Sequence, residues 1–389
     1  MIARSGDEDG GRLLLISESP IEQIWTQLSM WESRALALKL IMERAERADV
    51  LIGREKAEAK ALALSYCLRN ARENLREPRQ TLTLKTVANY YGCMWFASAI
   101  VAADPANDVD LPQLERFTKK GHGLGNFVDP DKAFPANEYV YVKEGGFYPE
   151  FLRASAIDAS RIALRKAPVR GGPDGEDRSV GMMALFARVP ELADAYRYVT
   201  GEWPFNFRIF HSSRNMGEDV DDAQRAGPLS AVIPKRARDY TWLGLGTTLA
   251  IPRDHLITHG PPLTELDIKT YAGSTHWEGK WPTTVGGHWW ETLKTYKSAM
   301  CGQSWIKPLF GEVQEPFSIH LVLLYQLSIL ARYRPAVWRE IIEGDEDQYQ
   351  VLFTGYDQVV TRILPELALR RIYDRHVHIT QPGSWSAPL

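Results

Sequence analysis

The stretch ANYYGCMWFASAIVAAD, residues 88–104, is apolar on most faces of a helix. A helix that is apolar all round is buried, whereas a surface helix keeps a polar face toward water. We therefore expect a helix over residues 84–103, ended by Pro105, that lies at the centre of a helical bundle.

The helices that cover this centre are predicted at both ends of the chain. On the N-terminal side, the spacing of apolar residues predicts helices over residues 19–42 and 54–76. On the C-terminal side, residues 315–333 form a strongly apolar helical pattern, and a further helix is predicted over residues 349–373.

The middle of the chain has a different pattern. Residues 139–142 predict a strand, which a Gly-Gly turn at 145–146 follows. Further short strand candidates lie at FRIF 207–210, AVI 231–233 and TTLAI 247–251. Residues 170–179 and 214–227 have the composition of exposed loops. The predicted fold class is therefore mainly α with a small β-containing middle section (α+β), with a helical bundle built from both ends of the chain.

These patterns divide the chain into four regions. They are a flexible N-terminus (1–18), an N-terminal helical region (19–125), a mixed α/β middle region (126–312) and a C-terminal helical region (313–389). We expect the last region to pack with the N-terminal helices as one domain.

Composition excludes several function classes. The 389 residues carry a formal net charge of -3, so any contact with nucleic acid or acidic membranes needs a local basic patch. The three cysteines are far apart, which argues against a disulfide scaffold and a thiolate metal site. The first twelve residues contain no apolar run, and no segment reaches eighteen consecutive apolar residues, so we expect no signal peptide and no membrane span. We expect a cytoplasmic protein with no membrane contact and no cofactor.

The stretch KKGHGLGNF, residues 119–127, resembles a phosphate-binding loop at first sight. A dinucleotide fingerprint needs a strand before its glycines, and a phosphate loop needs a lysine after them; here a helix and both lysines come first. We therefore expect a helix C-terminus at Lys119 and Lys120, a left-handed cap at Gly121 and a constrained turn that presents His122. His122 is the first residue to test by mutation, because histidine titrates near neutral pH.

His255 and His259 stand four residues apart, as two metal ligands on one helix face would. The zinc-protease motif also needs a glutamate after the first histidine, where Leu256 stands. No third ligand is identifiable, so we predict no metal site.

A basic patch is the main candidate for binding. Its members, if the helical ends meet, are Lys119, Lys120, His122, Arg332 and Arg334. Such a patch would suit a phosphate group or the backbone of RNA or DNA. In the structural alternative, the two arginines only cap a helix and pair with Glu340 or Glu343.

Arg371 and His376 are separated by four residues, a spacing that resembles the catalytic pair of HEPN ribonucleases. The resemblance implies a histidine that acts as acid or base on a ribose 2′-hydroxyl and an arginine that steadies the phosphate. It also implies a homodimer, because such sites commonly need two copies. Ile372 departs from the pattern, since these nucleases usually carry Asn, Asp or His there.

Five stretches, in order, resemble the YaaC-like family of bacterial proteins. They are IWTQLSMWES (24–33), ANYYGCMWFASAIVA (88–102), KKGHGLGNF (119–127), EGGFYPEFL (144–152) and LYQLSILARYRPAVW (324–338). The order holds from about residue 19 to 372, so the resemblance covers nearly the whole chain.

The resemblance implies a largely helical protein whose bundle is similar to HEPN-type bundles, which occur in RNA cleavage, nucleic-acid binding and phage defence. We expect a binding or assembly protein that acts on nucleic acid or on another phosphate-bearing ligand, in bacterial defence, as a homodimer or with a partner protein. The alternative is a metal-independent ribonuclease that uses Arg371 and His376.

Overall fold

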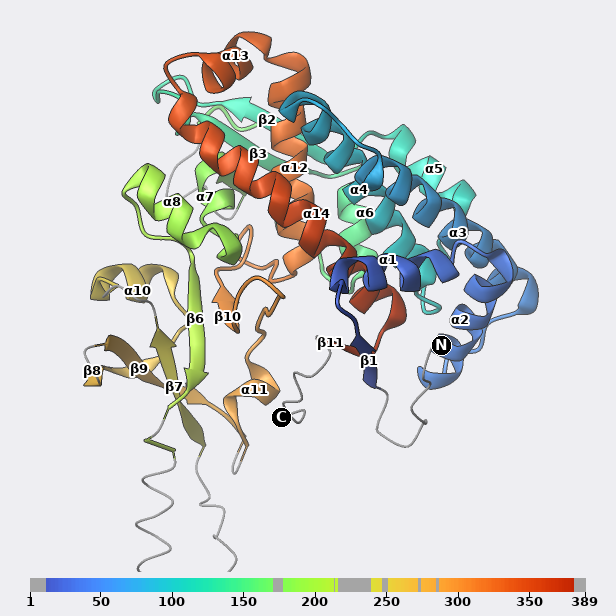
Figure 1. Cartoon of the computed structure of the whole chain (residues 1–389), viewed down its shortest axis with the longest axis horizontal. Helices are drawn as coiled ribbons and strands as arrows, with labels where there is room; N and C mark the ends of the chain where they lie inside the picture. Colours follow the sequence, from blue (N-terminus) through green and yellow to red (C-terminus); the bar gives the residue numbers. More distant parts are fainter. Residues whose placement is uncertain are drawn as a thin grey trace, which may run out of the picture. The chain divides into compact units, whose positions relative to one another are not determined.

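The computed structural model describes most of the chain, in two compact units (Figure 1). The described residues are 12–170, 178–212, 214–215, 239–246, 251–271, 274–284 and 287–380. Unit 1 consists of Met1–Leu185 together with Glu315–Leu389, and unit 2 consists of Phe186–Gln314.

Unit 1 is mainly helical. Its helices are α1 (Pro20–Met30), α2 (Arg34–Arg47), α3 (Arg54–Arg76), α4 (Leu82–Ala103), α5 (Leu111–Lys119), α6 (Phe147–Ala154), α12 (Pro316–Tyr333), α13 (Pro335–Glu343) and α14 (Gln350–Tyr373), with the 3-10 turn η3 (Asp347–Tyr349). The short helix α7 (Met182–Phe186) lies at the boundary with unit 2.

Helix α4 lies at the centre of this bundle, in contact with α3, α12 and α14 (Figure 1). Most of its side chains are buried, as are most of those of α12. Asn89 on α4 donates a hydrogen bond to the Asp357 carboxylate on α14, 2.9 Å away. The prediction that residues 84–103 form the buried helix is therefore confirmed, and its neighbours come from both ends of the chain.

Unit 1 also holds two small sheets. In the first, β1 (Arg12–Ile16) pairs in parallel with β11 (His376–Thr380). In the second, β3 (Glu138–Lys143) pairs with three strands: β2 (Leu124–Val128), β4 (Ala163–Leu164) and β5 (Ser179–Gly181). The strand predicted at 139–142 is β3, and the chain after the Gly-Gly turn forms helix α6.

Unit 2 is built on an antiparallel sheet of order β10-β6-β7-β9-β8. Its strands are β6 (Asn206–His211), β7 (Tyr240–Gly246), β8 (Thr264–Tyr271), β9 (Ser274–Pro282) and β10 (Ser304–Ile306). Its helices are η2 (Pro190–Leu192), α8 (Ala193–Thr200), α10 (Arg253–His259) and α11 (Trp289–Thr292). Alternate residues of β6 and β7, such as Phe207 and Leu245, form the core with Trp289 and Trp305.

The predicted fold class, mainly α with a β-containing middle, is confirmed. The prediction of one helix over residues 19–42 is wrong, because the chain turns after Trp31 between α1 and α2. Trp31 is buried and stacks on Tyr373, with ring centroids 5.8 Å apart. The Glu32 carboxylate accepts two hydrogen bonds from Arg72. These contacts stabilise a corner that local spacing does not show.

Some expectations fall on residues outside the described part of the chain. These are most of the two loops, at 171–177 and 216–227, the strand candidates at 231–233 and 247–250, and residues 1–11. Residues 12–16, which belong to the segment expected to be flexible, form β1.

Candidate anion-binding site

The turn that presents His122 is held by backbone hydrogen bonds. Helix α5 ends at Lys119, and Gly121 follows with a positive φ of 87°, as the predicted left-handed cap requires. The carbonyls of Gly121 and His122 accept hydrogen bonds from the amides of Phe147 and Tyr148, at 3.0 and 2.9 Å. The start of α6 therefore fixes the position of the His122 backbone.

Two glycines make this packing possible. A Cβ on Gly146 would lie 2.4 Å from the backbone nitrogen of Gly123, and a Cβ on Gly123 would lie 2.6 Å from the Tyr148 nitrogen. Both glycines have positive φ, 114° at Gly146 and 76° at Gly123. Side chains at either position would separate the two turns, so the glycines serve close backbone approach.

The His122 ring is half-buried between aromatic rings. Its centroid lies 5.4 Å from that of Tyr90 and 6.1 Å from that of Tyr325. Burial, together with the positive charges of Arg332 and Lys143, lowers the pKa of His122 below its ordinary value. The imidazole is therefore neutral at pH 7, in a region of positive potential, and neither ring nitrogen has a hydrogen-bond partner among the described residues.

Arg332, at the end of α12, lies over tyrosines. Its guanidinium carbon is 4.8 Å from the ring centroid of Tyr333, 5.7 Å from that of Tyr91 and 5.9 Å from that of Tyr90. It donates hydrogen bonds to the Tyr91 hydroxyl and to the Ser328 carbonyl, each at 3.1 Å. No described carboxylate lies within ion-pair distance of Arg332, so its charge is available to a ligand.

An open cavity of about 440 Å³ lies beside this cluster. Lys120, Lys143 and Arg165 line it, together with Tyr141 and Glu144. The Arg165 guanidinium is paired with Glu144 at 3.0 Å. Lys120 and Lys143 are exposed and have no carboxylate partner within the described part of the chain. Arg332 and Lys143 act on His122, and Lys120 lines the cavity with Lys143; we refer to Lys120, Lys143 and Arg332 as the open cationic cluster.

The other two predicted patch residues are paired elsewhere. Arg334 lies 2.7 Å from Glu138, a carboxylate with no solvent exposure, which also accepts a hydrogen bond from Gln326. Burial raises the pKa of Glu138, and the charge of Arg334 opposes this rise. Lys119 pairs with Glu115 one turn earlier on α5, at 3.1 Å. The structural alternative, in which both arginines pair with Glu340 or Glu343, is wrong about the partner: Arg334 pairs with Glu138, and Arg332 has no carboxylate partner among the described residues.

Arg371 ties helices together. Its guanidinium donates to the Glu315 carboxylate at 3.1 Å and to the Ser155 hydroxyl at 3.2 Å. Glu315 also caps the N-terminus of α12. His376 begins β11, and its side chain lies outside the described part of the structure. The proposed catalytic pair of Arg371 and His376 stays a prediction.

A model of the YaaC-like protein family matches residues 29–372. The chain belongs to the YaaC-like family. Comparisons with curated proteins and with solved structures give no significant match.

The stretch at 324–338 of this YaaC-like protein serves both the fold and the cluster. The Tyr325 hydroxyl donates to the Leu124 carbonyl at 3.1 Å, and the Trp338 indole donates to the Thr83 hydroxyl at 2.8 Å. These bonds, with the Arg334 pair, attach α12 and α13 to β2, β3 and α4. Arg332, in the same stretch, belongs to the open cationic cluster.

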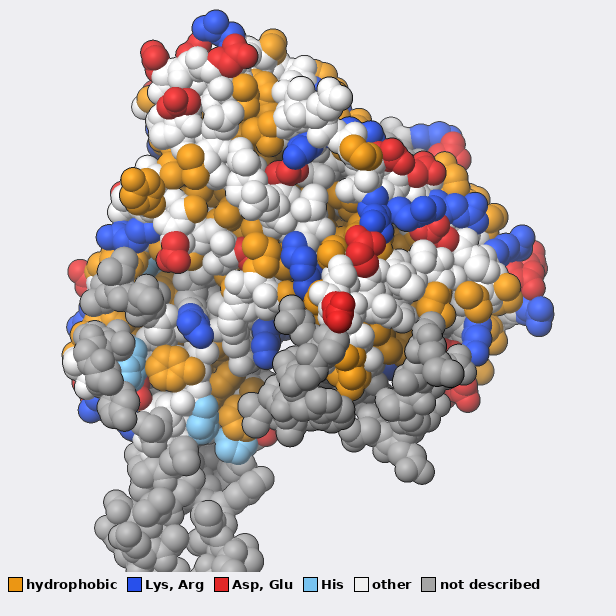
Figure 2. Space-filling model, in the orientation of Figure 1, with side chains coloured by type: hydrophobic (Ala, Val, Ile, Leu, Met, Phe, Trp, Pro, Cys, Tyr) orange, Lys and Arg blue, Asp and Glu red, His pale blue; other side chains and the backbone are white. Residues whose placement is uncertain are grey.

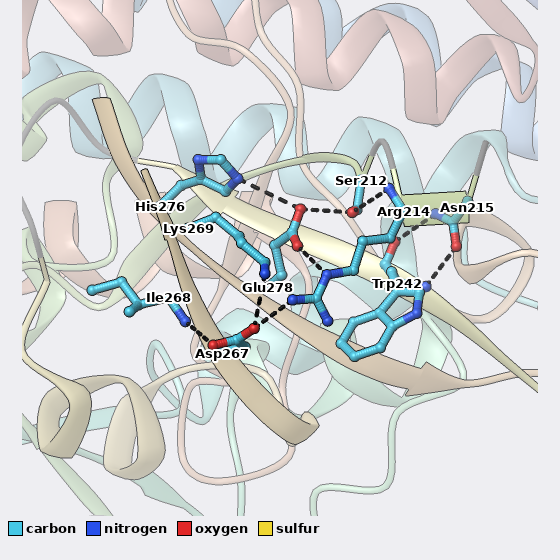
Figure 3. A network of polar contacts seen from close by, with 9 residues as sticks. All are labelled: Ser212, Arg214, Asn215, Trp242, Asp267, Ile268, Lys269, His276 and Glu278. Carbon is cyan, nitrogen blue, oxygen red and sulfur yellow. Dashed lines mark hydrogen bonds and ion pairs between the residues drawn. The ribbon is translucent and has the colours of Figure 1, made fainter. Parts of the chain in front are cut away.

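Unit 2 of the YaaC-like chain contains a polar network that the sequence did not reveal (Figure 3). Its centre is Glu278, which is 2% exposed. Its carboxylate lies 2.8 Å from the Arg214 guanidinium, accepts a hydrogen bond from Ser212 at 2.6 Å and lies 3.5 Å from His276. Arg214 also pairs with Asp267. The spacing of two between His276 and Glu278, which places both on one face of β9, is the only local signal.

This network connects β9 to the segment that follows β6. The Ser212 hydroxyl donates to the Glu278 carboxylate and has no hydrogen bond to His276 within the described residues, so the serine–histidine pair of a hydrolase is not formed here. Asn215 exchanges two hydrogen bonds of 2.9 Å with the backbone of Trp242. The two cations Arg214 and Lys269 balance the two carboxylates Glu278 and Asp267, so these four side chains carry no net charge.

The two histidines four residues apart on α10, His255 and His259, pack against an aromatic ring. Both rings lie against Phe205, with centroids 5.9 and 4.3 Å away, and His255 contacts the Pro204 carbonyl at 3.0 Å. The residues that the structure describes contain no group of three side chains able to hold a metal ion. Within the same residues, no helix has the length and apolar character needed to cross a lipid bilayer.

Several charges over other helices of unit 1 are paired. On the face drawn in Figure 2, basic and acidic side chains lie beside one another over α1 to α3. The pairs there include Arg72 with Glu32 at 2.8 Å and Arg76 with Glu22 at 2.9 Å. The open cationic cluster differs from these pairs because three cations without a described carboxylate partner lie close to one cavity and one histidine.

Proposed function

We propose that this YaaC-like protein binds a phosphate-bearing ligand, with nucleic acid as the main candidate, at the open cationic cluster. The observation that carries the proposal is that Arg332 and Lys143 lie near His122, that Lys120 lines the same cavity as Lys143, and that none of these three cations has a carboxylate partner among the described residues. Glu144, which also lines the cavity, is paired with Arg165. Phosphate oxygens would supply the negative charge that the protein does not place there.

The state of His122 supports this proposal. Two cations close enough to lower the pKa of an imidazole also attract an anion to the same place. A neutral imidazole with free ring nitrogens can donate to a phosphate oxygen or accept from a hydroxyl group. The site thus offers both charge and hydrogen bonds.

The fixed backbone supports it further. The turn that carries His122 is hydrogen-bonded to the start of α6. Lys143, the last residue of β3, is attached to the same turn, because its amide donates to the Gly123 carbonyl at 2.9 Å. A site on rigid elements holds its charges together at low entropic cost to the ligand complex. Only the lysine side chains themselves have to be ordered.

A salt titration of binding tests the proposal. Fluorescence anisotropy with labelled RNA and DNA oligomers of about 20 nucleotides should detect binding at about 50 mM salt and weaker binding as salt rises. The double variant Lys120→Gln/Lys143→Gln should reduce the slope of log K against log salt by about 2, one unit for each lost phosphate contact.

Lys119→Gln is the matched control, because this exposed lysine stands beside Lys120 and is paired with Glu115. Its slope should equal that of the natural chain. Absence of binding at low salt, or an equal loss in the control, would overturn the proposal.

A further inference from the structure

The open cationic cluster is bordered by exposed tyrosine rings. Tyr333, the last residue of α12, is 66% exposed, and Tyr91 on α4 is 38% exposed. Both lie around Arg332, whose guanidinium carbon is 4.8 and 5.7 Å from their ring centroids. Two exposed rings therefore flank an arginine that has no carboxylate partner among the described residues.

Aromatic rings and an arginine plane provide surfaces for stacking. Arg332 faces the tyrosine rings, and the exposure of Tyr333 leaves much of that ring accessible to another planar group. Bases of single-stranded nucleic acid stack on tyrosine and on guanidinium groups, whereas the bases of a duplex are already stacked on one another.

The phosphate-binding groups lie next to these rings. Arg332 and His122 both lie against the Tyr90 ring, 5.9 and 5.4 Å from its centroid, and the Lys143 amide donates to the Gly123 carbonyl at 2.9 Å. The tyrosines and the cavity lined by Lys120 and Lys143 therefore adjoin the turn that carries His122. A strand with bases on one side and phosphates on the other would fit this order.

We infer that the ligand is single-stranded nucleic acid, with a base stacked on Tyr333 and Tyr91 beside Arg332 and the backbone phosphates along Lys143 and Lys120. This inference rests on the proposed function and adds the class of nucleic acid. Single strands and duplexes both carry phosphates, so the phosphate cluster alone would not distinguish them. The tyrosines would distinguish them, because the bases of a duplex are not free to stack on a protein ring.

The test compares four ligands at one salt concentration. They are a single-stranded oligomer, the corresponding duplex, an oligomer of the same length with abasic sugars, and inorganic polyphosphate. The single strand should bind at least about tenfold tighter than the duplex and the abasic oligomer, since one stacked base contributes a factor of this order. RNA and DNA versions of the single strand show whether the 2′-hydroxyl contributes.

Variants assign the stacking to particular rings. Tyr333→Ala should weaken single-strand binding about tenfold and leave abasic binding nearly unchanged, while Tyr333→Phe should keep both. Tyr198→Ala, which removes a 91% exposed tyrosine in unit 2, should change neither. Thermal unfolding of each variant shows that the fold is kept.

The outcomes separate the two proposals. Equal binding of the single strand, the duplex and the abasic oligomer would overturn this inference and leave phosphate binding standing. Binding to none of the four ligands would overturn the proposed function as well. An equal loss of single-strand and abasic binding in Tyr333→Ala would show that the tyrosine acts only by supporting Arg332, and would also overturn the stacking inference.

Discussion

The network around Glu278 in unit 2 and the open cationic cluster in unit 1 are both built around an arginine, and they differ in how its charge is balanced. Arg214 is held by Glu278 and Asp267, whereas Arg332 has hydroxyls, a carbonyl and tyrosine rings around it and no described carboxylate. The first arrangement is complete within the protein. The second leaves positive charge for something outside it.

The same contrast recurs within one helix end. Arg332 and Arg334 stand two residues apart, yet Arg334 pairs with buried Glu138 and Arg332 does not. Counting basic residues therefore says little about binding. What matters is whether a carboxylate already lies beside each cation.

The largest effect is expected where the balanced network is broken. Arg214→Leu leaves the buried Glu278 carboxylate without its cation, so the free energy of unfolding should fall by about 3 kcal/mol. Chemical denaturation, followed by a signal from unit 2 tryptophans, measures this loss. Lys269→Leu is the control, because Lys269 pairs only with the half-exposed Asp267 at the edge of the network; its effect should stay below about 0.5 kcal/mol. An equal effect of both variants would contradict the stated role of Glu278.

The next effect concerns the backbone that supports the open cluster. Gly146→Ala should destabilise the protein by about 2 kcal/mol, because the new Cβ would collide with the Gly123 backbone and the residue has a φ of 114°. Gly121→Ala should cost about 1 kcal/mol, since its φ is also positive but no atom lies within 4 Å of the added Cβ. Unfolding midpoints of the two variants in one denaturant series compare them directly. A larger loss for Gly121→Ala would refute the close-packing explanation.

A smaller effect, on binding alone, is expected at Arg332. Arg332→Gln should lower the affinity for a phosphate-bearing oligomer about tenfold, or about 1.4 kcal/mol, and change unfolding by less than about 0.5 kcal/mol. Arg334→Gln should do the reverse, with a marked loss of stability because Glu138 stays buried and unpaired. Fluorescence anisotropy measures the affinity of each variant, and thermal unfolding of the same samples measures its stability. If both arginines affected only stability, the open cluster would have no binding role.

The smallest effect is a pH dependence from His122. Burial and the nearby cations lower its pKa in the folded protein, so the ring gains its proton at a lower pH than an ordinary histidine does, and the added charge should then strengthen binding of an anion several-fold. The free energy of unfolding should change in the opposite direction. Near its titration range, His122 binds fewer protons in the folded state than in the unfolded state. The stabilisation that its neutral form provides is therefore present at neutral pH and is lost as the pH falls through the lowered pKa. Anisotropy and unfolding series between about pH 5 and 8 measure both trends. His122→Gln should flatten both, and an unchanged pH profile in this variant would show that another group titrates.

Much of the helical fold could be predicted because the pattern is local. The stretch at 54–76 matches α3 from end to end, and the apolar stretch at 88–104 identified α4 as the buried helix. The corner after Trp31 could not be predicted in this way, because its partners include Tyr373, near the other end of the chain. Contacts across such a separation leave no trace in local spacing.

The candidate site was predicted in part. Gly121 as a left-handed cap followed from the helix end before it, and the proximity of His122 and Arg332 followed from the meeting of the two helical ends. The proximity of Lys143 to His122 was not predicted, because only the pairing of β3 with β2 brings the two together. The diversion of Arg334 to Glu138 could not be seen either, since the two are separated by 196 positions.

The division of unit 1 into two separate segments of the chain has a consequence during synthesis. The ribosome makes α4 early, but α12, α14 and β11, which cover it and close the sheet with β1, emerge only after all of unit 2. Unit 2 is continuous and can fold while the nascent chain is still growing. The apolar surface of α4 must remain without these partners for that whole interval. Newly made chains are therefore expected to depend on chaperones until about residue 380 has left the exit tunnel.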